Sequence, residues 1–194
     1  NKINILKNID LHIKFGDIVK LSGKNGSGKT TLLRIIAGII SHDDGELRRQ
    51  NTHLNEIYLV SNNERSFFWR LSVEENMRYF LTLANIKFNE KLIMEFLEIF
   101  ALNDIFKKKF MHLSTGQKRL MLILRGILLK PKLLMLDEPF LGLDMENKKK
   151  INQVLIENFI GNNNSLIMVS HNENIDIKFS QHIILKDGNI IHNA

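Results

Sequence analysis

The sequence predicts an α/β protein in which the strands of a mostly parallel sheet alternate with helices. Short apolar runs typical of buried strands recur along the chain, and segments with helical periodicity separate them. A largely helical segment, about residues 72–113, interrupts this alternation. Neighbouring parallel strands need long connections, which are usually helices. The 194 residues are 44% hydrophobic, which suffices for the core of a single domain over residues 1–194.

The strands follow from the apolar runs. Alternating apolar and polar residues over 9–15 predict a half-buried strand, which ends at a turn formed by Gly16 and Asp17. A hairpin is expected over 182–193, with its turn at Asp187-Gly188. Four further runs predict strands: 18–23, 57–61, 133–139 and 165–171. Of these, 57–61 and 165–171 are expected to be buried, and 133–139 to be fully buried.

Five segments predict helices, and three of these begin at a recognisable N-cap. Ser72 with Glu75, and Ser114 with Gln117, form capping boxes, and Asn89 is a simpler N-cap. The expected helices cover residues 30–38, 72–84, 89–102, 114–130 and 145–160.

The composition argues against several classes of protein. No window reaches the roughly 18 uninterrupted apolar residues of a membrane span, because Arg125 and Gly126 break the longest candidate. No stretch reads as a signal peptide, and the absence of cysteine excludes disulfides and thiol chemistry. The net charge is +6, with short basic runs at 107–109 and 148–150. These scattered charges predict solvated faces, and we expect no nucleic-acid partner.

The stretch GKNGSGKT, residues 23–30, is the phosphate-binding loop pattern. It lies between an expected strand and an expected helix. Its glycines allow positive φ angles, so that several backbone N–H groups can point at one anion. In this pattern Lys29 reaches the β- and γ-phosphates, and the hydroxyl of Thr30 is placed to bind Mg²⁺. The loop alone does not separate kinases, GTPases and other ATPases.

The run LLMLDEP places two carboxylates at the end of a buried strand. Asp137, facing the phosphate loop, can hold Mg²⁺ through water. Glu138 can orient or deprotonate an attacking water. An acidic pair at a strand end is common, but one that follows such a run and precedes Pro139 favours a site for Mg²⁺ and an attacking water.

The stretch LSTGQ, residues 113–117, narrows the family. Ser114 caps a helix whose first N–H groups stay open, which predicts a second anion site. Placed shortly before the acidic strand, LSTGQ resembles the LSGGQ signature of the ATP-binding cassette (ABC) ATPases, with Thr115 in place of the first glycine. GKNGSGKTTLLRIIAG resembles the family's Walker A motif, and LLMLDEP resembles its Walker B motif with Glu138 as the catalytic residue. LGLD, ending at Asp144, and VSH, ending at His171, resemble its D-loop and switch strand.

The resemblance covers essentially the whole chain and implies a fold and a mechanism. The fold would be a P-loop NTPase (RecA-like) core with an N-terminal antiparallel β subdomain and a helical subdomain at about 72–113. ATP and Mg²⁺ would be sandwiched between two such domains, in a homodimer or a heterodimer. A transmembrane permease would hold the pair at the cytoplasmic face of a membrane.

The resemblance also assigns roles to residues. Glu138, Lys29 and His171 would be catalytic, with His171 contacting the γ-phosphate and the attacking water. Thr30, Asp137 and Asn62 would bind the metal. The residues that would contact ATP are Gly23, Lys24, Asn25, Gly26, Ser27, Gly28, Lys29, Thr30, Thr31, Ser114, Thr115, Gly116, Gln117 and Asp144. Without the other motifs His171 would be read as structural and Asp144 as a loop cap.

Two departures from the family pattern stand out. The family usually senses Mg²⁺ with a glutamine, whereas here Asn62 or Asn63, one methylene shorter, takes that place. The family also stacks an aromatic residue on adenine from a strand that would lie upstream of Asn1. Since the chain does not begin with Met, we expect a preceding N-terminal piece.

Residues 64–71, ERSFFWRL, are unusually aromatic for a loop. They predict either core packing or a seat for a membrane partner. The surrounding stretch resembles ATPase subunits of exporters, so export is the expected direction. The alternatives are a soluble ABC ATPase acting on ribosomes or DNA, and a P-loop kinase or GTPase. The order of Ser114, Asp137, Glu138 and His171 speaks against the latter.

Overall fold

The computed structural model describes residues 4–49, 52–61, 66–160, 164–170 and 176–192. They form one six-stranded sheet in the order β2-β3-β4-β1-β5-β6. The strands are β1 (Ile18–Ser22), β2 (Ile57–Val60), β3 (Leu133–Asp137), β4 (Ser165–Val169), β5 (Gln181–Lys186) and β6 (Asn189–His192). All neighbours pair in parallel except β5 and β6, which form the predicted hairpin.

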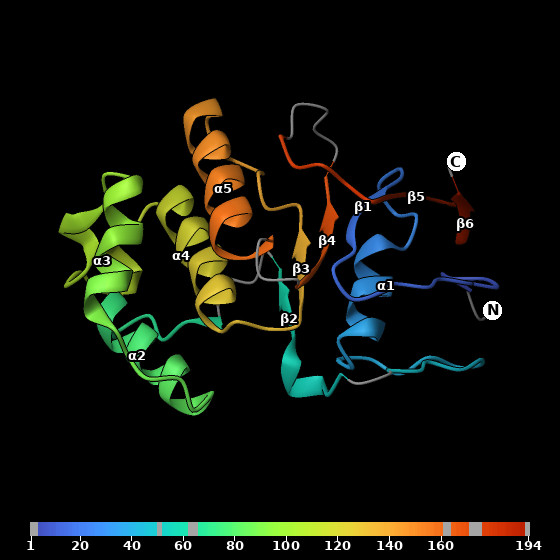
Figure 1. Ribbon diagram of the computed structural model, residues 1–194, viewed down its shortest axis with the longest axis horizontal. Helices are drawn as coiled ribbons and strands as arrows, with labels where there is room; N and C mark the ends of the chain where they lie inside the picture. Colours follow the sequence, from blue (N-terminus) through green and yellow to red (C-terminus); the bar gives the residue numbers. More distant parts are fainter. Residues whose placement is uncertain (1–3, 50–51, 62–65, 161–163, 171–175, 193–194) are drawn as a thin grey trace.

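Helices cover both faces of the sheet. Figure 1 shows α1 on one side of the strands, and α4 and α5 on the other. The helices are α1 (Lys29–Ile36), α2 (Val73–Leu83), α3 (Glu90–Ile99), α4 (Thr115–Leu128) and α5 (Met145–Asn158), with 3-10 turns η1 (Leu54–Glu56), η3 (Asn103–Ile105) and η4 (Phe110–His112). The predicted α/β class is confirmed.

Side-chain alternation along the strands divides the hydrophobic core into two parts. In β3, Met135 packs with Leu33 of α1, whereas Leu134 and Leu136 pack in the larger cluster that includes α4 and α5. Successive side chains of a strand point to opposite faces, so a strand covered on both faces must be apolar throughout. The continuous apolar runs of β3 and β4 meet this requirement.

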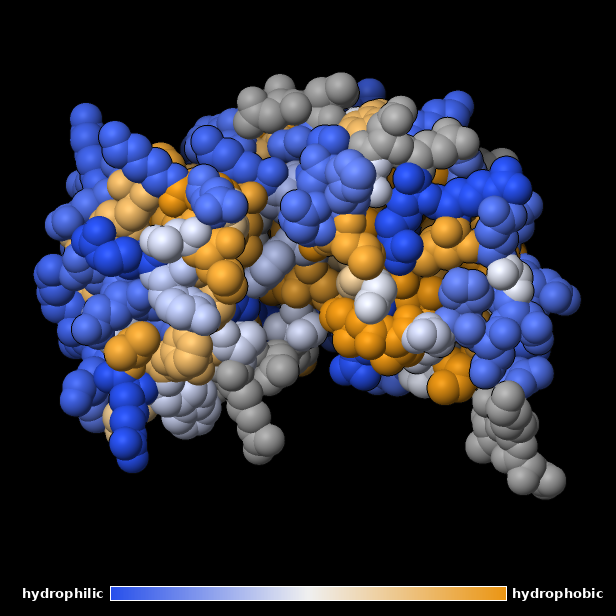
Figure 2. Space-filling view, turned by 90° about the horizontal axis from the view of Figure 1, so that it is seen from below, coloured by the Kyte–Doolittle hydropathy of each residue, from blue (hydrophilic) through white to orange (hydrophobic). Residues whose placement is uncertain are grey.

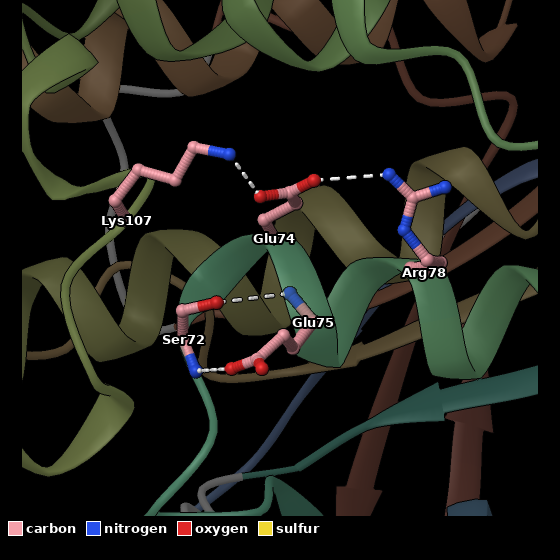
Figure 3. Close-up of polar contacts among 5 residues, drawn as sticks. All are labelled: Ser72, Glu74, Glu75, Arg78 and Lys107. Carbon is pink, nitrogen blue, oxygen red and sulfur yellow. Dashed lines mark hydrogen bonds and ion pairs between the residues drawn. The ribbon is translucent and has the colours of Figure 1, made fainter.

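The helical middle of the chain starts where its N-caps predict. The Ser72 hydroxyl accepts a hydrogen bond from the Glu75 N–H at 3.1 Å, and the Glu75 carboxylate accepts one from the Ser72 N–H at 2.7 Å (Figure 3). Asn89 caps α3 in the expected way. In Figure 1, α2 and α3 lie at the end of the molecule farthest from β6. In the described ranges, no helix is long and apolar enough to cross a membrane.

The strand predicted over 9–15 is wrong. Ile9, Leu11 and Ile13 are half-buried against the α1 side of the sheet, whereas Phe15 is 51% exposed, so the predicted alternation of burial holds only over residues 9–13. Residues 9–15 nevertheless form no strand, and the antiparallel subdomain predicted at the N-terminus is not formed by residues 4–17. A strand needs a neighbour to satisfy its N–H and C=O groups, and none of the described segments pairs with this one.

Candidate nucleotide-binding site

The glycine loop connects β1 to α1 at the carboxyl end of the parallel strands. Gly23, Gly26 and Gly28 all have positive φ, of 146°, 80° and 105°. A β-carbon on Gly23 would lie 2.2 Å from the Leu185 carbonyl oxygen, so this glycine is also required by its close approach to β5. The three conformations turn the loop around the N-terminus of α1, where unpaired N–H groups and the helix dipole favour an anion.

The side chain of Lys29 lies along the inside of this loop. Its ammonium donates hydrogen bonds to the carbonyl oxygens of Gly23 at 2.8 Å and Lys24 at 3.0 Å. The residue is only 6% exposed. The Ser27 hydroxyl oxygen of the same loop is buried without a hydrogen-bond partner. The loop therefore concentrates one positive charge and several polar donors in a small volume.

The side chains of Thr30 and Asp137 meet at the carboxyl edge of the sheet. The Thr30 hydroxyl donates to Asp137 Oδ2 at 2.8 Å, although 107 residues separate them in the sequence. Both are hard oxygen ligands, and Mg²⁺ is usually held by one or two such side chains together with substrate phosphates and water. The pair therefore fits the predicted metal. Groups of three or more His, Cys, Asp or Glu that could hold a metal by themselves do not occur among the described residues.

Glu138 has an unusual backbone. Its φ is 50°, in the left-handed region of backbone conformation. A residue other than glycine adopts this conformation at a cost of about 1–3 kcal/mol. Its N–H donates to the Val169 carbonyl of β4 at 3.1 Å. Its carbonyl accepts a hydrogen bond from a terminal guanidinium nitrogen of Arg119. The Nε of the same arginine donates to the Pro139 carbonyl at 3.3 Å. The strained residue is thus held from both sides.

The predicted signature segment begins α4. Ser114 and Gln117 form the expected capping box: the Ser114 hydroxyl accepts from the Gln117 N–H at 3.2 Å, and the Gln117 side chain accepts from the Ser114 N–H at 2.9 Å. Ser114 and Thr115 are exposed, and Gly116 is half-buried near Leu143. The hydroxyls of this segment are open to a second molecule.

Asp144 is the N-cap of α5, which was the alternative reading of this residue. Its carboxylate accepts from the Asn147 N–H and from the Asn147 side-chain amide, both at 2.8 Å. The backbone N–H of Asn147 is the main cause that lowers the pKa of this carboxyl. Asp144 is exposed, so a cap and an interface contact are compatible. His171, Asn62 and Asn63 lie outside the described residues.

Sequence reasoning missed two buried arginines of α4. Arg119 holds the Glu138 and Pro139 carbonyls. The guanidinium of Arg125 donates to the Ser66 carbonyl at 2.9 Å and hydroxyl at 2.7 Å, and it lies 4.2 Å from the Phe67 ring centroid. Burial lowers the pKa of Arg125. Charged residues inside the otherwise apolar run of α4 were the available signal, since a buried charge needs fixed partners.

The aromatic run is buried at one residue and exposed at the next two. Phe67 is core: it is buried and stacks on Phe110 with ring centroids 4.3 Å apart. Phe68 and Trp69 are 46% and 44% exposed. The Lys118 ammonium lies 4.7 Å from the Trp69 ring centroid. Figure 2 shows apolar side chains exposed over the helical part of the molecule as well as over the sheet part.

A parallel sheet with this loop at its carboxyl edge, and with an acidic strand end bonded to the residue after the loop lysine, defines a P-loop nucleotide-binding protein. Residues 6–141 match the family described as ABC transporter. The chain therefore belongs to the ABC transporter family, as one of its ATP-binding domains, and the resemblance drawn from the motifs is confirmed.

Individual relatives agree with this assignment. The chain is 34% identical over 198 residues to the spermidine/putrescine import ATP-binding protein PotA of Spiroplasma citri, covering 96% of this chain but only 56% of that protein. It is 31% identical over 194 residues to the zinc import ATP-binding protein ZnuC of Wolbachia pipientis wMel, covering 96% and 75%. A dimeric structure of a post-hydrolysis state of the ATP-binding cassette MJ0796, bound to ADP and Pi, superposes with a TM-score of 0.80 at 26% identity, covering 96% and 88%.

Proposed function

We propose that this chain binds and hydrolyses ATP with Mg²⁺ and thereby powers a membrane transporter. The observation that carries the proposal is the hydrogen bond between Thr30 and Asp137, because it joins the phosphate loop to the acidic end of β3 in one site. Family membership and the ADP- and Pi-bound cassette of similar fold support hydrolysis as the reaction.

The proposed roles follow from the geometry. The Lys29 ammonium would exchange its two loop carbonyls for the β- and γ-phosphate oxygens. Thr30 and Asp137 would hold Mg²⁺, which when bound would neutralise phosphate charge. Glu138 follows Asp137 directly and would orient and deprotonate the attacking water. The proposed roles of His171 and Asn62 rest on the motif resemblance alone.

The proposed assembly is a pair of cassettes with ATP between them. Ser114, Thr115, Gly116 and Gln117 of one chain would contact the ATP held by the loop of the other, and Asp144 would lie at the interface. A dimer of the similar cassette supports this arrangement. Within each chain, we propose that residues 72–113 act as a subdomain that moves with the signature segment.

The proposed membrane partner is a permease, which would hold the pair at the cytoplasmic face of a membrane. Phe68 and Trp69, the exposed residues of the aromatic run, would contact it. The PotA and ZnuC relatives are named as import ATP-binding proteins. The export direction predicted from the sequence has no support among them.

The experiment that tests the function compares wild type with Lys29→Ala for ATP binding and phosphate release, at a fixed Mg²⁺ concentration. Lys29 supplies the main positive charge of the loop, so its loss should abolish tight ATP binding and with it hydrolysis. Lys91→Ala, a change to an exposed lysine of α3 outside the proposed site, is the matched control and should retain binding. Wild-type affinity in Lys29→Ala would refute the assignment of this loop.

A further inference from the structure

Arg119 contacts the backbone of the proposed catalytic residue. It lies two residues beyond the signature segment, in the first turns of α4, and is only 6% exposed. One terminal guanidinium nitrogen donates to the Glu138 carbonyl, and Nε donates to the Pro139 carbonyl at 3.3 Å. Two successive carbonyls are therefore held by one planar group.

The contact with Arg119 matters because Glu138 has a strained backbone conformation. The φ of 50° fixes the direction in which the Glu138 side chain leaves the backbone. The peptide before Glu138 is held by the Val169 carbonyl of β4, and the peptide after it is held by Arg119. A side chain other than glycine persists in this region only where its surroundings hold it. Arg119 and β4 together supply that constraint.

We infer that Arg119 is a positioning residue, which aims the Glu138 carboxylate and couples it to the signature segment at the start of the same helix. The inference rests on the proposed function. In the proposed pair of cassettes, Ser114 contacts the ATP of the opposite site, whereas Glu138 acts on the ATP of its own chain. Arg119 lies between the two. A shift of α4 caused by ATP at one site then changes the aim of Glu138 at the other, which is a coupling between sites.

The chemistry of arginine suits this task better than that of lysine. The guanidinium donates from several nitrogens in a fixed plane, so that it can hold two neighbouring carbonyls in one geometry. A lysine ammonium is a single nitrogen on a flexible stem. A competing role is structural only: the Glu138 carbonyl also accepts from the Leu141 N–H at 3.3 Å, so that Arg119 would merely support a turn.

A double-mutant cycle separates the two roles. Arg119→Met should lower kcat for ATP by roughly 10²-fold, the scale expected when a catalytic group is displaced by about an ångström, while the KM for ATP stays unchanged. Arg119→Lys should lie between Met and wild type. If Arg119 acts through Glu138, then adding Arg119→Met to Glu138→Gln should slow single-turnover hydrolysis little further. Equal slowing in both backgrounds would overturn the inference.

A matched control uses the second buried arginine of α4. Arg125→Met removes a guanidinium that bonds to Ser66 and does not touch Glu138. It should lower the melting temperature but leave the kcat of the folded protein near that of wild type. The same loss of kcat in both arginine variants would assign the effect to the integrity of α4 and refute the inference. If Arg119→Met does not fold, Arg119→Lys carries the same cycle.

The proposed function fails in a different way. Wild-type hydrolysis by Glu138→Gln alone would refute the role of Glu138 and hence the proposed mechanism. Slow hydrolysis by Glu138→Gln, combined with additive slowing by the arginine variant, would refute the role of Arg119 only.

Discussion

At the scale of single residues, the glycines of the phosphate loop meet different constraints. A β-carbon on Gly23 would lie 2.2 Å from the backbone oxygen of Leu185, whereas one on Gly26 would meet nothing within 4 Å. Both residues have positive φ. Position 23 therefore requires glycine both for its positive φ and because a β-carbon has no room there. Position 26 requires glycine only for its positive φ.

This difference predicts unequal effects of alanine. Gly26→Ala should cost about 1–2 kcal/mol of folding free energy, the usual penalty for a side chain in the left-handed region. Gly23→Ala should cost distinctly more and should weaken ATP binding, because the loop must move away from β5. Urea denaturation and nucleotide titration of the two variants measure this. Equal stabilities would contradict the close approach of Gly23 to β5.

The residue scale is also where the sequence was least informative. The motif spacing was enough to expect Thr30 and Asp137 at one site, and the Thr30 hydroxyl lies 2.8 Å from Asp137 Oδ2. The left-handed backbone of Glu138 could not be predicted, since glutamate has no local preference for it and tertiary bonds impose it. The charged residues in the apolar α4 segment were a signal that arginines are buried there, but they do not show what Arg119 contacts, since its partners are backbone carbonyls.

At the scale of elements, the N-terminus of α2 combines a capping box with an ion-pair network. Glu74 accepts from Lys107 and, at 2.9 Å, from Arg78 (Figure 3). The hydrogen bond from Lys107 is the main cause that lowers the pKa of the Glu74 carboxyl, and the bond from Arg78 lowers it further. The negative charge also faces the positive end of the helix dipole. Glu74 therefore ties α2 to the segment that leads to η4.

The network predicts a pH dependence of stability. Because the folded state lowers the pKa of Glu74 below its ordinary value of 4.5, its stabilisation is complete above that pH and is lost as the pH falls through the folded-state pKa. Glu74→Gln cannot titrate, so its melting temperature should fall less than that of wild type between about pH 6 and pH 3. Glu95→Gln, which removes an exposed carboxylate 3.9 Å from Lys91, is the control and should follow wild type. A wild-type pH profile in Glu74→Gln would contradict the network.

Elements were predictable where their signals are local. The capping boxes at Ser72 and Ser114 and the cap at Asn89 place three helix starts correctly, because each uses hydrogen bonds within one turn. The strand over 9–15 failed because pairing depends on a distant neighbour. Phe67 and Phe68 are adjacent and chemically identical, yet one is buried and the other exposed, which only the packing of α2 and η4 decides.

At the scale of the whole molecule, the strand order assembles the site. β4 lies between β3 and β1, so the end of β3 and the loop after β1 lie on either side of its carboxyl end. Ligands of open parallel sheets bind at such edges. Lys29, Thr30, Asp137 and Glu138 gather there. The alternation of strands and helices was enough to predict a parallel sheet, but not this order, which depends on how the crossovers pack.

The proposed assembly predicts the behaviour of Glu138→Gln. Glutamine keeps the size of the side chain but loses the carboxylate that would deprotonate water, so hydrolysis should fall by roughly 10²–10⁴-fold. ATP and Mg²⁺ should still bind through Lys29, Thr30 and Asp137. The ATP-bound closed form would accumulate, and an ATP-dependent dimer should be visible under conditions in which we expect wild type to show only monomer.

Sizing chromatography with and without ATP and Mg²⁺, beside a phosphate-release assay, measures both effects. Asp137→Asn is the matched control, since it also removes one negative charge but weakens the metal site, and it should give neither turnover nor dimer. Retained turnover in Glu138→Gln would exclude this residue as the general base. Slow turnover without dimerisation would keep the base but refute the paired cassettes, because a site completed by a second chain must hold that chain as long as ATP stays intact.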